Sequence, residues 1–168
     1  MALELLGNLG RKVSALAPIM PLRGAYASHI PDHLLVRPVD PWQGDAQIGG
    51  HLANGAFQMG EEQFVLRGTT WCPLGMSQIW LNYLHSFNWL RDLRAFGGDK
   101  ARFAGAAYIK NWIDLNRDKK SEGWRADRLG ARLTMWISHY DFFAAHDEDF
   151  QDMFFPSIVS QARHLMRS

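Results

Sequence analysis

The stretch LHSFNWLRDLRAFGG, residues 84–98, contains the side chains best suited to binding chemistry. His85, Asn88, Trp89 and Asp92 are separated by the three- and four-residue steps that bring side chains together on one face of an α-helix. The His, Asn and Asp side chains can exchange hydrogen bonds with a ligand, and the Trp ring offers a flat apolar surface. Drawn on a helical wheel, the four lie opposite the main apolar stripe, which comprises Ile79, Trp80, Tyr83, Leu84, Phe87, Leu90 and Leu93. This arrangement favours the wall of a partly polar groove.

The same residues also have a purely structural interpretation. A His, an Asn and an Asp at these spacings can hydrogen-bond one another or a helix end, as most buried polar groups do. Leu81 and Phe96 share their side of the wheel, so that side is neither a clean solvent face nor a clean core face. The residues alone therefore leave two interpretations open, a groove wall and internal packing.

The elements that must position this stretch are predicted to be helices from residue 76 onward. Gly97–Gly98 is a common helix end, Asp99 is the expected N-cap of the next helix, and Asp147 is that of a fourth helix. Pro156 is expected to interrupt or restart this fourth helix. The apolar spacing places the first three helices at about 77–96, 100–116 and 125–145.

Helices joined by short loops form αα-hairpins, so the expected fold class is mainly α. Trp89, Trp112 and Trp136 are 23 and 24 residues apart, which favours a tryptophan at a similar height in successive antiparallel helices. For Trp112 and Trp136 taken alone, core packing is the better interpretation, since aromatic residues at helical spacing usually belong to the core. Tyr140 lies on the apolar face of its helix and is assigned to the core for the same reason.

Residues 1–75 differ in composition from residues 76–168, and we treat the two segments as one domain. This half contains most of the prolines and many glycines, so it is expected to be rich in loops. A weak helix is predicted near the N-terminus, and HIPDHLLVRPVDPWQGD should be extended because it holds three prolines in eleven residues. The turn residues Gly60-Glu61-Glu62 between two short apolar runs indicate a possible β-hairpin.

The composition excludes several classes of function. With 18 Lys and Arg against 17 Asp and Glu, and no long block of like charge, a nucleic-acid footprint is not expected. No run approaches the length of a membrane span, and the N-terminus is not a convincing signal peptide, which leaves the cytoplasm and the periplasm open. Cys72 is the single cysteine, and His29 and His33 are separated by Pro31, so neither a multi-cysteine zinc site nor a helical metal pair is expected. No cofactor-binding motif is present, because the glycine-rich segments lack the strand-then-helix context of a phosphate loop.

Several pieces of the chain occur in a characteristic order. DPWQGDAQIGGHLANGAFQMGEEQFVL is followed by HSFNWLRDL, a Gly-Asp turn, NWIDLN, LGARLTMWISHYDFF and SIVSQARHL. Across residues 38–168 this series resembles the helical N-terminal region of the bacterial heparinase II/III-like polysaccharide lyases. The resemblance implies part of an (α/α) toroid, incomplete at this length, in which helical hairpins surround a carbohydrate-binding cleft.

The resemblance also implies a chemistry. Members of this family cleave acidic, uronate-containing polysaccharides by β-elimination, which needs a base such as Tyr or His and a group that neutralises the uronate carboxylate. His85, Asn88, Trp89 and Asp92 are the candidate substrate-binding residues. The family's catalytic Tyr and His match no position here, so the catalytic residues are unknown. His139 and Tyr140 do not form a base pair of this kind, because adjacent helical residues diverge by about 100°.

Two hypotheses follow. In the first, the chain is the N-terminal part of such a lyase, a fragment that is inactive alone and exposes apolar helix faces through which it self-associates. In the second, it is a non-enzymatic helical interaction module, complete at 168 residues, whose tryptophans form a closed core.

Overall fold

The computed structural model describes residues 30–66, 70–144 and 147–168, and the helix expected near the N-terminus lies outside these ranges. The described residues are mainly helical with one antiparallel two-stranded sheet, which confirms the expected fold class and the β-hairpin. The elements are α1 (Ala46–Leu52), β1 (Ala56–Met59), β2 (Glu62–Val65), α2 (Gln78–Ser86), α3 (Leu90–Phe96), α4 (Gly98–Leu115), the 3₁₀ turn η1 (Glu122–Trp124), α5 (Ala126–Ser138), α6 (Tyr140–Phe143) and α7 (Glu148–Leu165). Within the described ranges, no helix combines the length and the apolarity needed to cross a membrane.

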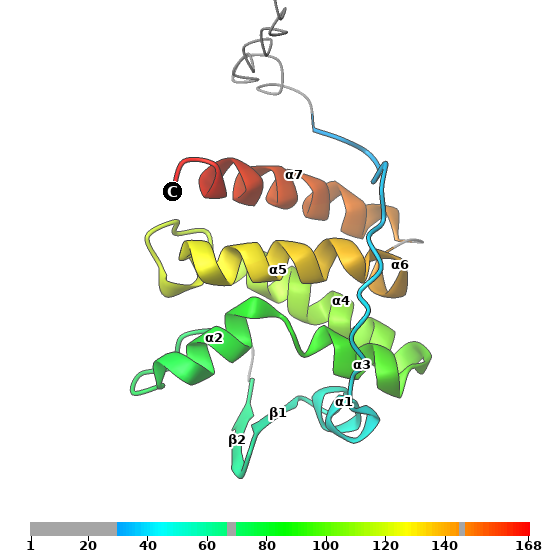
Figure 1. Ribbon diagram of the computed structural model, residues 1–168, viewed down its shortest axis with the longest axis vertical. Helices are drawn as coiled ribbons and strands as arrows, with labels where there is room; N and C mark the ends of the chain where they lie inside the picture. Colours follow the sequence, from blue (N-terminus) through cyan, green and yellow to red (C-terminus); the bar gives the residue numbers. More distant parts are fainter. Residues whose placement is uncertain (1–29, 67–69, 145–146) are drawn as a thin grey trace, which may run out of the picture.

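The C-terminal helices pack through aromatic side chains. The helices α4, α5 and α7 run in alternating directions (Figure 1). Trp112 of α4 meets Trp136 of α5 edge to face with ring centroids 5.6 Å apart, and Trp136 lies 5.8 Å from Phe154 of α7. All three side chains are at most 1% exposed, and Tyr140 is 4% exposed. The core assignment of Trp112, Trp136 and Tyr140 is therefore confirmed.

The helix expected at 77–96 is broken in the middle, and this part of the prediction was wrong. α2 ends at Ser86, Phe87 adopts the left-handed conformation with φ 60°, and α3 begins only at Leu90. A non-glycine residue in this conformation costs about 1–2 kcal/mol. The Phe87 ring is completely buried, 5.3 Å from the ring of Trp71 and 5.1 Å from that of Trp136. Burial of a phenylalanine, at about 1.5–3 kcal/mol, offsets the strain.

The other helix boundaries agree with the sequence in part. Asp147 caps α7, since its carboxylate accepts a hydrogen bond of 2.9 Å from the Phe150 amide. Asp99 is not an N-cap, because α4 begins at Gly98 and Asp99 lies in the first turn, where a carboxylate still favours the helix dipole. Helix α7 continues through Pro156 without interruption, in contrast to the prediction.

The helix expected at 125–145 divides into α5 and α6. His139 separates them, with φ −108° and ψ 9°, and its ring Nδ1 lies 3.0 Å from the carbonyl oxygen of Met135.

Packing explains why α7 continues through Pro156. The neighbouring side chains of Phe154, Phe155 and Ile158 are all buried and stabilise the helix at this point. The hydrogen bond that proline cannot donate is thus compensated by packing.

Helix α1 was not predicted, and it packs against α3 at very short range. Asp45 caps α1 by accepting hydrogen bonds from the amides of Gln47 and Ile48. A Cβ atom placed on Gly49 would lie 2.0 Å from the carbonyl oxygen of Asp92, so the two backbones meet where a side chain has no room. Only glycine permits this approach.

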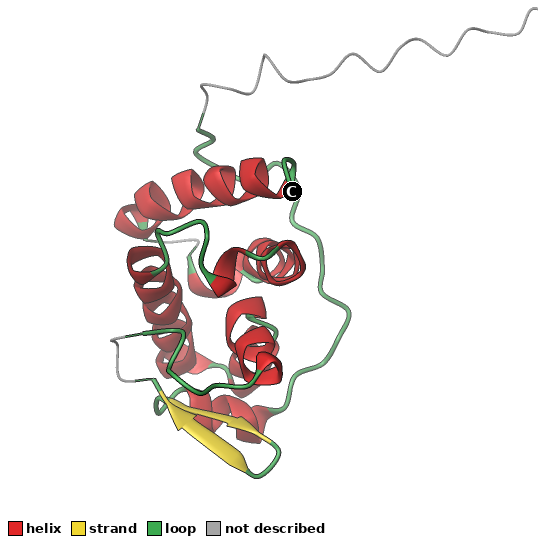
Figure 2. Ribbon diagram, turned by 90° about the vertical axis from the view of Figure 1, so that its left-hand side faces the viewer, coloured by secondary structure: helices red, strands yellow, loops and turns green. Residues whose placement is uncertain are grey.

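Residues 30–45 form an extended strap without helix or strand, as expected from their prolines. The strap follows one side of the molecule from α7 to α1 (Figures 1 and 2). Asp40 anchors it, since the Arg91 guanidinium donates to both carboxylate oxygens at 2.6 and 3.3 Å. Burial alone would raise the pKa of Asp40, but the hydrogen bonds and charge of Arg91 outweigh it and hold the pKa below its ordinary value. Arg37 adds an exposed ion pair of 2.7 Å with Asp141.

Candidate functional site

A small pocket opens between α2, the turn that follows it and the first turns of α5. Its volume is about 260 Å³. The lining residues are mostly polar: Asn82, Tyr83, Ser86, Asn88, Asp127, Arg128 and Ala131. Of the lining residues, Asn82 and Asn88 carry exposed amide groups, and Asp127 carries an exposed carboxylate. We refer to this feature as the α2–α5 pocket.

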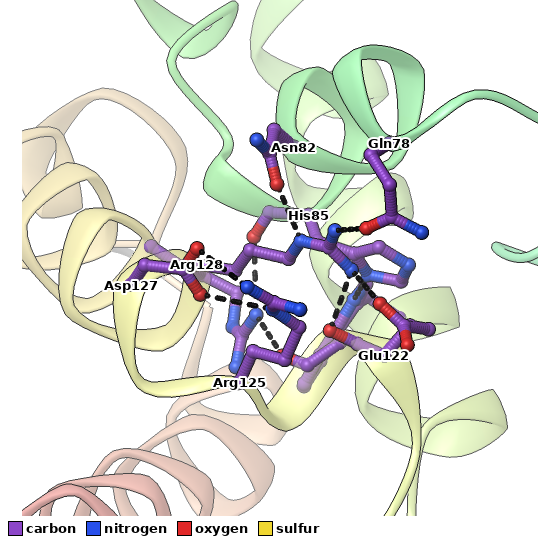
Figure 3. A network of polar contacts seen from close by, with 10 residues as sticks. Gln78, Asn82, His85, Glu122, Arg125, Asp127 and Arg128 are labelled. Carbon is purple, nitrogen blue, oxygen red and sulfur yellow. Dashed lines mark hydrogen bonds and ion pairs between the residues drawn. The ribbon is translucent and has the colours of Figure 1, made fainter.

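Arg128 forms the base of the α2–α5 pocket and is only 2% exposed. Figure 3 shows its guanidinium between side chains of α2 and the backbone of η1. It donates to Asn82 Oδ1 at 2.6 Å and to Gln78 Oε1 at 2.5 Å on α2, and to the carbonyl and carboxylate oxygens of Glu122 at 2.9 and 2.6 Å. Because its donors are engaged in this way, Arg128 positions the pocket wall and leaves ligand contact to its neighbours.

Asp127 lies beside this network and is paired with Arg125 at 3.4 Å (Figure 3). Its slight burial acts to raise its pKa, but the hydrogen bond and charge of Arg125 outweigh this effect and lower the pKa. Asp127 therefore stays ionised, which suits it to accept hydrogen bonds from hydroxyl groups.

Tyr83 contributes a phenol that the sequence had assigned only to the apolar stripe. Within the described ranges its hydroxyl is buried and has no hydrogen-bond partner. Burial, followed by the nearby charge of Asp92, raises the pKa of Tyr83 well above its ordinary value. The phenol is thus protonated at neutral pH and can donate a hydrogen bond, whereas it is poorly suited to act as a base.

The structure separates the four residues singled out in the sequence. Of these four, Asn88 lines the α2–α5 pocket, and the others do not. Because the helix breaks at Phe87, residues before and after this position no longer follow one helical wheel. The groove face expected from a continuous helix is therefore not formed.

His85 lies in the core behind the pocket, with no exposed surface. Its Nδ1 accepts a hydrogen bond of 3.0 Å from the Trp112 indole, so the proton of the neutral ring is on Nε2. Burial, together with the charges of Arg132 and Arg128, lowers the pKa of His85 to about 3. His85 is accordingly neutral near pH 7.

Trp89 and Asp92 have structural positions as well. Trp89 is fully buried, its indole donates to the Leu84 carbonyl at 3.3 Å, and its ring lies 4.6 Å from that of Phe87. Asp92 accepts a hydrogen bond of 2.8 Å from the Asp45 amide and so joins α3 to the start of α1. Burial is the largest influence on Asp92 and raises its pKa.

Beneath the pocket, a second arginine joins four elements of the fold. Arg132 has no exposed surface and donates to the carbonyl oxygens of His85 and Gly123 at 3.0 and 2.8 Å and to Gln161 Oε1 at 2.7 Å. Its guanidinium carbon lies 3.8 Å from the ring centroid of Trp112. Carbonyl dipoles and a π face take the place of a carboxylate here, and burial lowers the pKa of Arg132.

Sequence reasoning did not find Asn82, Tyr83 or Arg128. Arg128 donates to side chains 46 and 50 residues away, and no local spacing pattern connects positions so far apart. A polar residue beside the apolar stripe of a predicted helix, such as Asn82, was the only available signal. Among the described residues, no group of three or more His, Cys, Asp or Glu side chains is arranged to hold a metal ion.

The α2–α5 pocket can therefore offer a hydroxyl-bearing ligand the amides of Asn82 and Asn88 and the carboxylate of Asp127. Among the described lining residues, no hydrogen bond joins a nucleophile to a base. Comparison of the chain with family models, curated proteins and solved structures finds no match.

Proposed function

We propose that this chain is the N-terminal helical part of a heparinase II/III-like polysaccharide lyase and contributes the α2–α5 pocket to a cleft for uronate-containing polysaccharide. The observation that carries the proposal is the ordered series of family-like segments in residues 38–168, one of which, HSFNWLRDL, contributes Asn88 to the pocket. The alternating directions of α4, α5 and α7 support it, since an (α/α) toroid is built from such hairpins.

The chemistry of the pocket is compatible with a sugar ligand. Asn82 and Asn88 offer exposed amide groups to hydroxyl or carboxylate groups of the sugar. β-Elimination also requires a base close to the C5 proton of the uronate and a group that stabilises the developing enolate. No residue of this chain is assigned to either role, so we expect the chain alone to bind polysaccharide without cleaving it.

The test is a binding titration of the 168-residue chain against a panel of uronate oligosaccharides by calorimetry. Asn88→Ala should weaken binding about fivefold, the value of one lost hydrogen bond to a polar ligand. Asn54→Ala removes another exposed amide, which lies beside the β-hairpin and outside the pocket, and should leave affinity unchanged. Absence of binding to every uronate, or equal losses in the two variants, would contradict the proposal.

A turnover assay addresses the enzymatic part separately. The product of β-elimination carries a double bond conjugated with the carboxylate, and its ultraviolet absorbance reports each cleavage. We expect no increase in absorbance with the isolated chain. Sustained turnover would show that catalytic groups are present that we have not identified.

One observation favours the alternative, a non-enzymatic helical interaction module. His85 and Trp89, two of the four candidate residues, have no exposed surface, and Trp71, Trp112 and Trp136 are at most 1% exposed. An aromatic core closed in this way can support a stable independent domain. A monodisperse monomer that unfolds cooperatively and binds no uronate oligosaccharide would favour this alternative over the lyase proposal.

A further inference from the structure

A buried histidine faces the strap where α5 meets α6. The side chain of His139 has no exposed surface, and its Nε2 lies 3.6 Å from Oδ2 of Asp40, the carboxylate that anchors the strap. Its Nδ1 lies 3.0 Å from the carbonyl oxygen of Met135, which can only accept a hydrogen bond, so Nδ1 carries the proton of the neutral ring. Nε2 therefore presents a lone pair to a carboxylate, and no other described residue gives it a hydrogen bond.

The interface around His139 already carries more positive than negative charge. Asp40 supplies a carboxylate from the strap, and Arg91 and Arg94 supply two guanidinium groups from α3. Arg91 donates to Asp40 at 2.6 Å, and Arg94 donates to the carbonyl oxygen of Trp42, also on the strap, at 3.2 Å. A proton on His139 would add a third positive charge, and all three would then share the Asp40 carboxylate.

These surroundings disfavour the protonated form of His139. Burial is the largest influence and lowers the pKa of His139, and the nearby charge of Arg94 lowers the pKa further. The Met135 carbonyl and the Asp40 carboxylate raise the pKa, but burial and the arginines outweigh them. While the strap is closed, His139 is therefore neutral near pH 7.

Two further titratable side chains at the junction do not compensate a charge on the histidine. Tyr140 is 4% exposed, and burial raises its pKa, so the phenol is uncharged near pH 7. Asp141 is exposed and is paired with Arg37 of the strap at 2.7 Å. The Arg37 guanidinium also lies 5.8 Å from the centroid of the Tyr140 ring. The contacts of Arg37 keep their charges at mildly acidic pH, so a pH response of the strap must come from the contacts around His139.

We propose that the strap is released by acid, because protonation of His139 frees residues 30–45 from α3 and from the α5–α6 junction. When the strap lifts, His139 meets water and regains the proton affinity of an ordinary histidine. The open form then binds a proton below about pH 6.5 that the closed form does not, so the closed form loses stability relative to the open form as pH falls. This device is independent of the ligand of the α2–α5 pocket, because no strap residue lines that pocket.

The test follows hydrogen exchange of the Trp42 amide by NMR in the full chain. This amide donates to Asp40 Oδ1 at 3.2 Å, so it is protected while the strap is closed. The measured rate, compared with the intrinsic rate at each pH, gives the opening constant. From pH 8 to pH 5 the constant should rise at least about fivefold and at most about thirtyfold, the limit for a histidine whose pKa in the open form is 6.5. Amides of α5 report global unfolding and should open far less often.

Two histidine variants isolate the titrating group. His139→Gln removes it, while the new side-chain amide can still donate to the Met135 carbonyl, so the opening constant should change less than about twofold over the same pH range. His33→Gln is the matched control, because His33 is an exposed histidine of the strap itself. This control should keep the full acid rise.

A third variant keeps the test decisive if His139→Gln does not fold. Arg94→Gln removes one positive charge that acts on His139 and keeps a donor for the Trp42 carbonyl. The His139 ring should then titrate at a higher pH, as its NMR shifts report, and the ratio of opening constants at pH 5 and pH 8 should be smaller. An unchanged titration of His139 in this variant would contradict the charge argument.

The remaining outcomes are equally clear. The same acid rise in His139→Gln as in the unchanged chain, or loss of the rise in His33→Gln, would overturn the proposal. Equal acid opening of strap and α5 amides would identify global unfolding instead. An opening constant that falls toward pH 5 would show that protonated His139 tightens its contact with Asp40, which is the opposite of release.

Discussion

The buried guanidinium of Arg132 should contribute strongly to the stability of this fold. In Arg132→Met the side chain keeps a similar volume but can no longer donate to the two carbonyl oxygens and the glutamine oxygen that it now serves. The contacts join α5 to α2, η1 and α7, so their loss affects four elements together. The free energy of unfolding is the quantity that reports the change.

The magnitude follows from the contacts. Three buried acceptors left without donors cost about 1–3 kcal/mol each, and the lost stacking on Trp112 adds about 2 kcal/mol. Removing a buried charge relieves a desolvation cost of several kcal/mol, which offsets part of this loss. We expect a net decrease of about 3 kcal/mol in the free energy of unfolding for Arg132→Met.

The assay is urea unfolding at pH 7 followed by tryptophan fluorescence, with linear extrapolation to water. Arg132→Lys keeps the charge but lacks the planar fork, so it should also lose about 2 kcal/mol. Arg102→Met serves as the control, because Arg102 pairs with the exposed Asp99 and lies over the ring of the exposed Phe103. This variant should lose no more than about 0.5 kcal/mol. An Arg132→Met protein within about 1 kcal/mol of the unchanged chain would refute this account of the core.

Three further predictions concern other parts of the fold. Gly49→Ala should lower the free energy of unfolding by about 1–3 kcal/mol, because its Cβ would overlap an α3 carbonyl oxygen at 2.0 Å. Gly50→Ala should lower it by under about 1 kcal/mol, because its Cβ would meet an aromatic ring at 3.3 Å. Similar thermal midpoints for the two variants would contradict the backbone contact. The pKa of His85 falls from 6.5 in the unfolded chain to about 3 in the folded chain, so the unfolded state binds the extra proton and stability should decrease as pH falls below 6.5. In His85→Gln the urea midpoint should depend less on pH between pH 6.5 and pH 5. The same pH dependence as in the unchanged chain would count against a buried neutral histidine. Asp40→Asn removes a carboxylate that accepts two hydrogen bonds from Arg91, so we expect a loss of about 2 kcal/mol and faster amide exchange in residues 30–45; exchange as slow as in the unchanged chain would show that other contacts hold the strap.

Local chemistry in the sequence was enough to predict several features of the fold. Gly60 supplies the positive φ of 62° that the hairpin turn requires, and the register pairs Met59 with Glu62 across it. Asp147 precedes a helical pattern and caps α7 as a short polar side chain does in that place. These features depend on residues a few positions apart, which is the range that sequence patterns report.

The candidate site was only partly within reach of the same reasoning. Asn88 was identified, but for the wrong geometry, since it lines the pocket from a turn and not from the face of a continuous helix. The break at Phe87 carries no glycine or proline signal, because burial of the ring between Trp71 and Trp136 stabilises the left-handed conformation. The apolar period along 77–96 is the same whether or not the chain turns there.

The sequence by itself determined the mainly helical class, the hairpin, the extended strap and the membership of Trp112 and Trp136 in the core, because periodicity, turn residues and side-chain hydrophobicity act locally. Only the tertiary structure decided which polar groups line a pocket and which are buried in the core. His85 is neutral and buried because Trp112 and Gly123 close over it, and Arg128 lies at a pocket because residues 46 and 50 positions away provide its acceptors. Burial and long-range hydrogen bonding are properties of the assembled chain, so no spacing within a single helix could assign them.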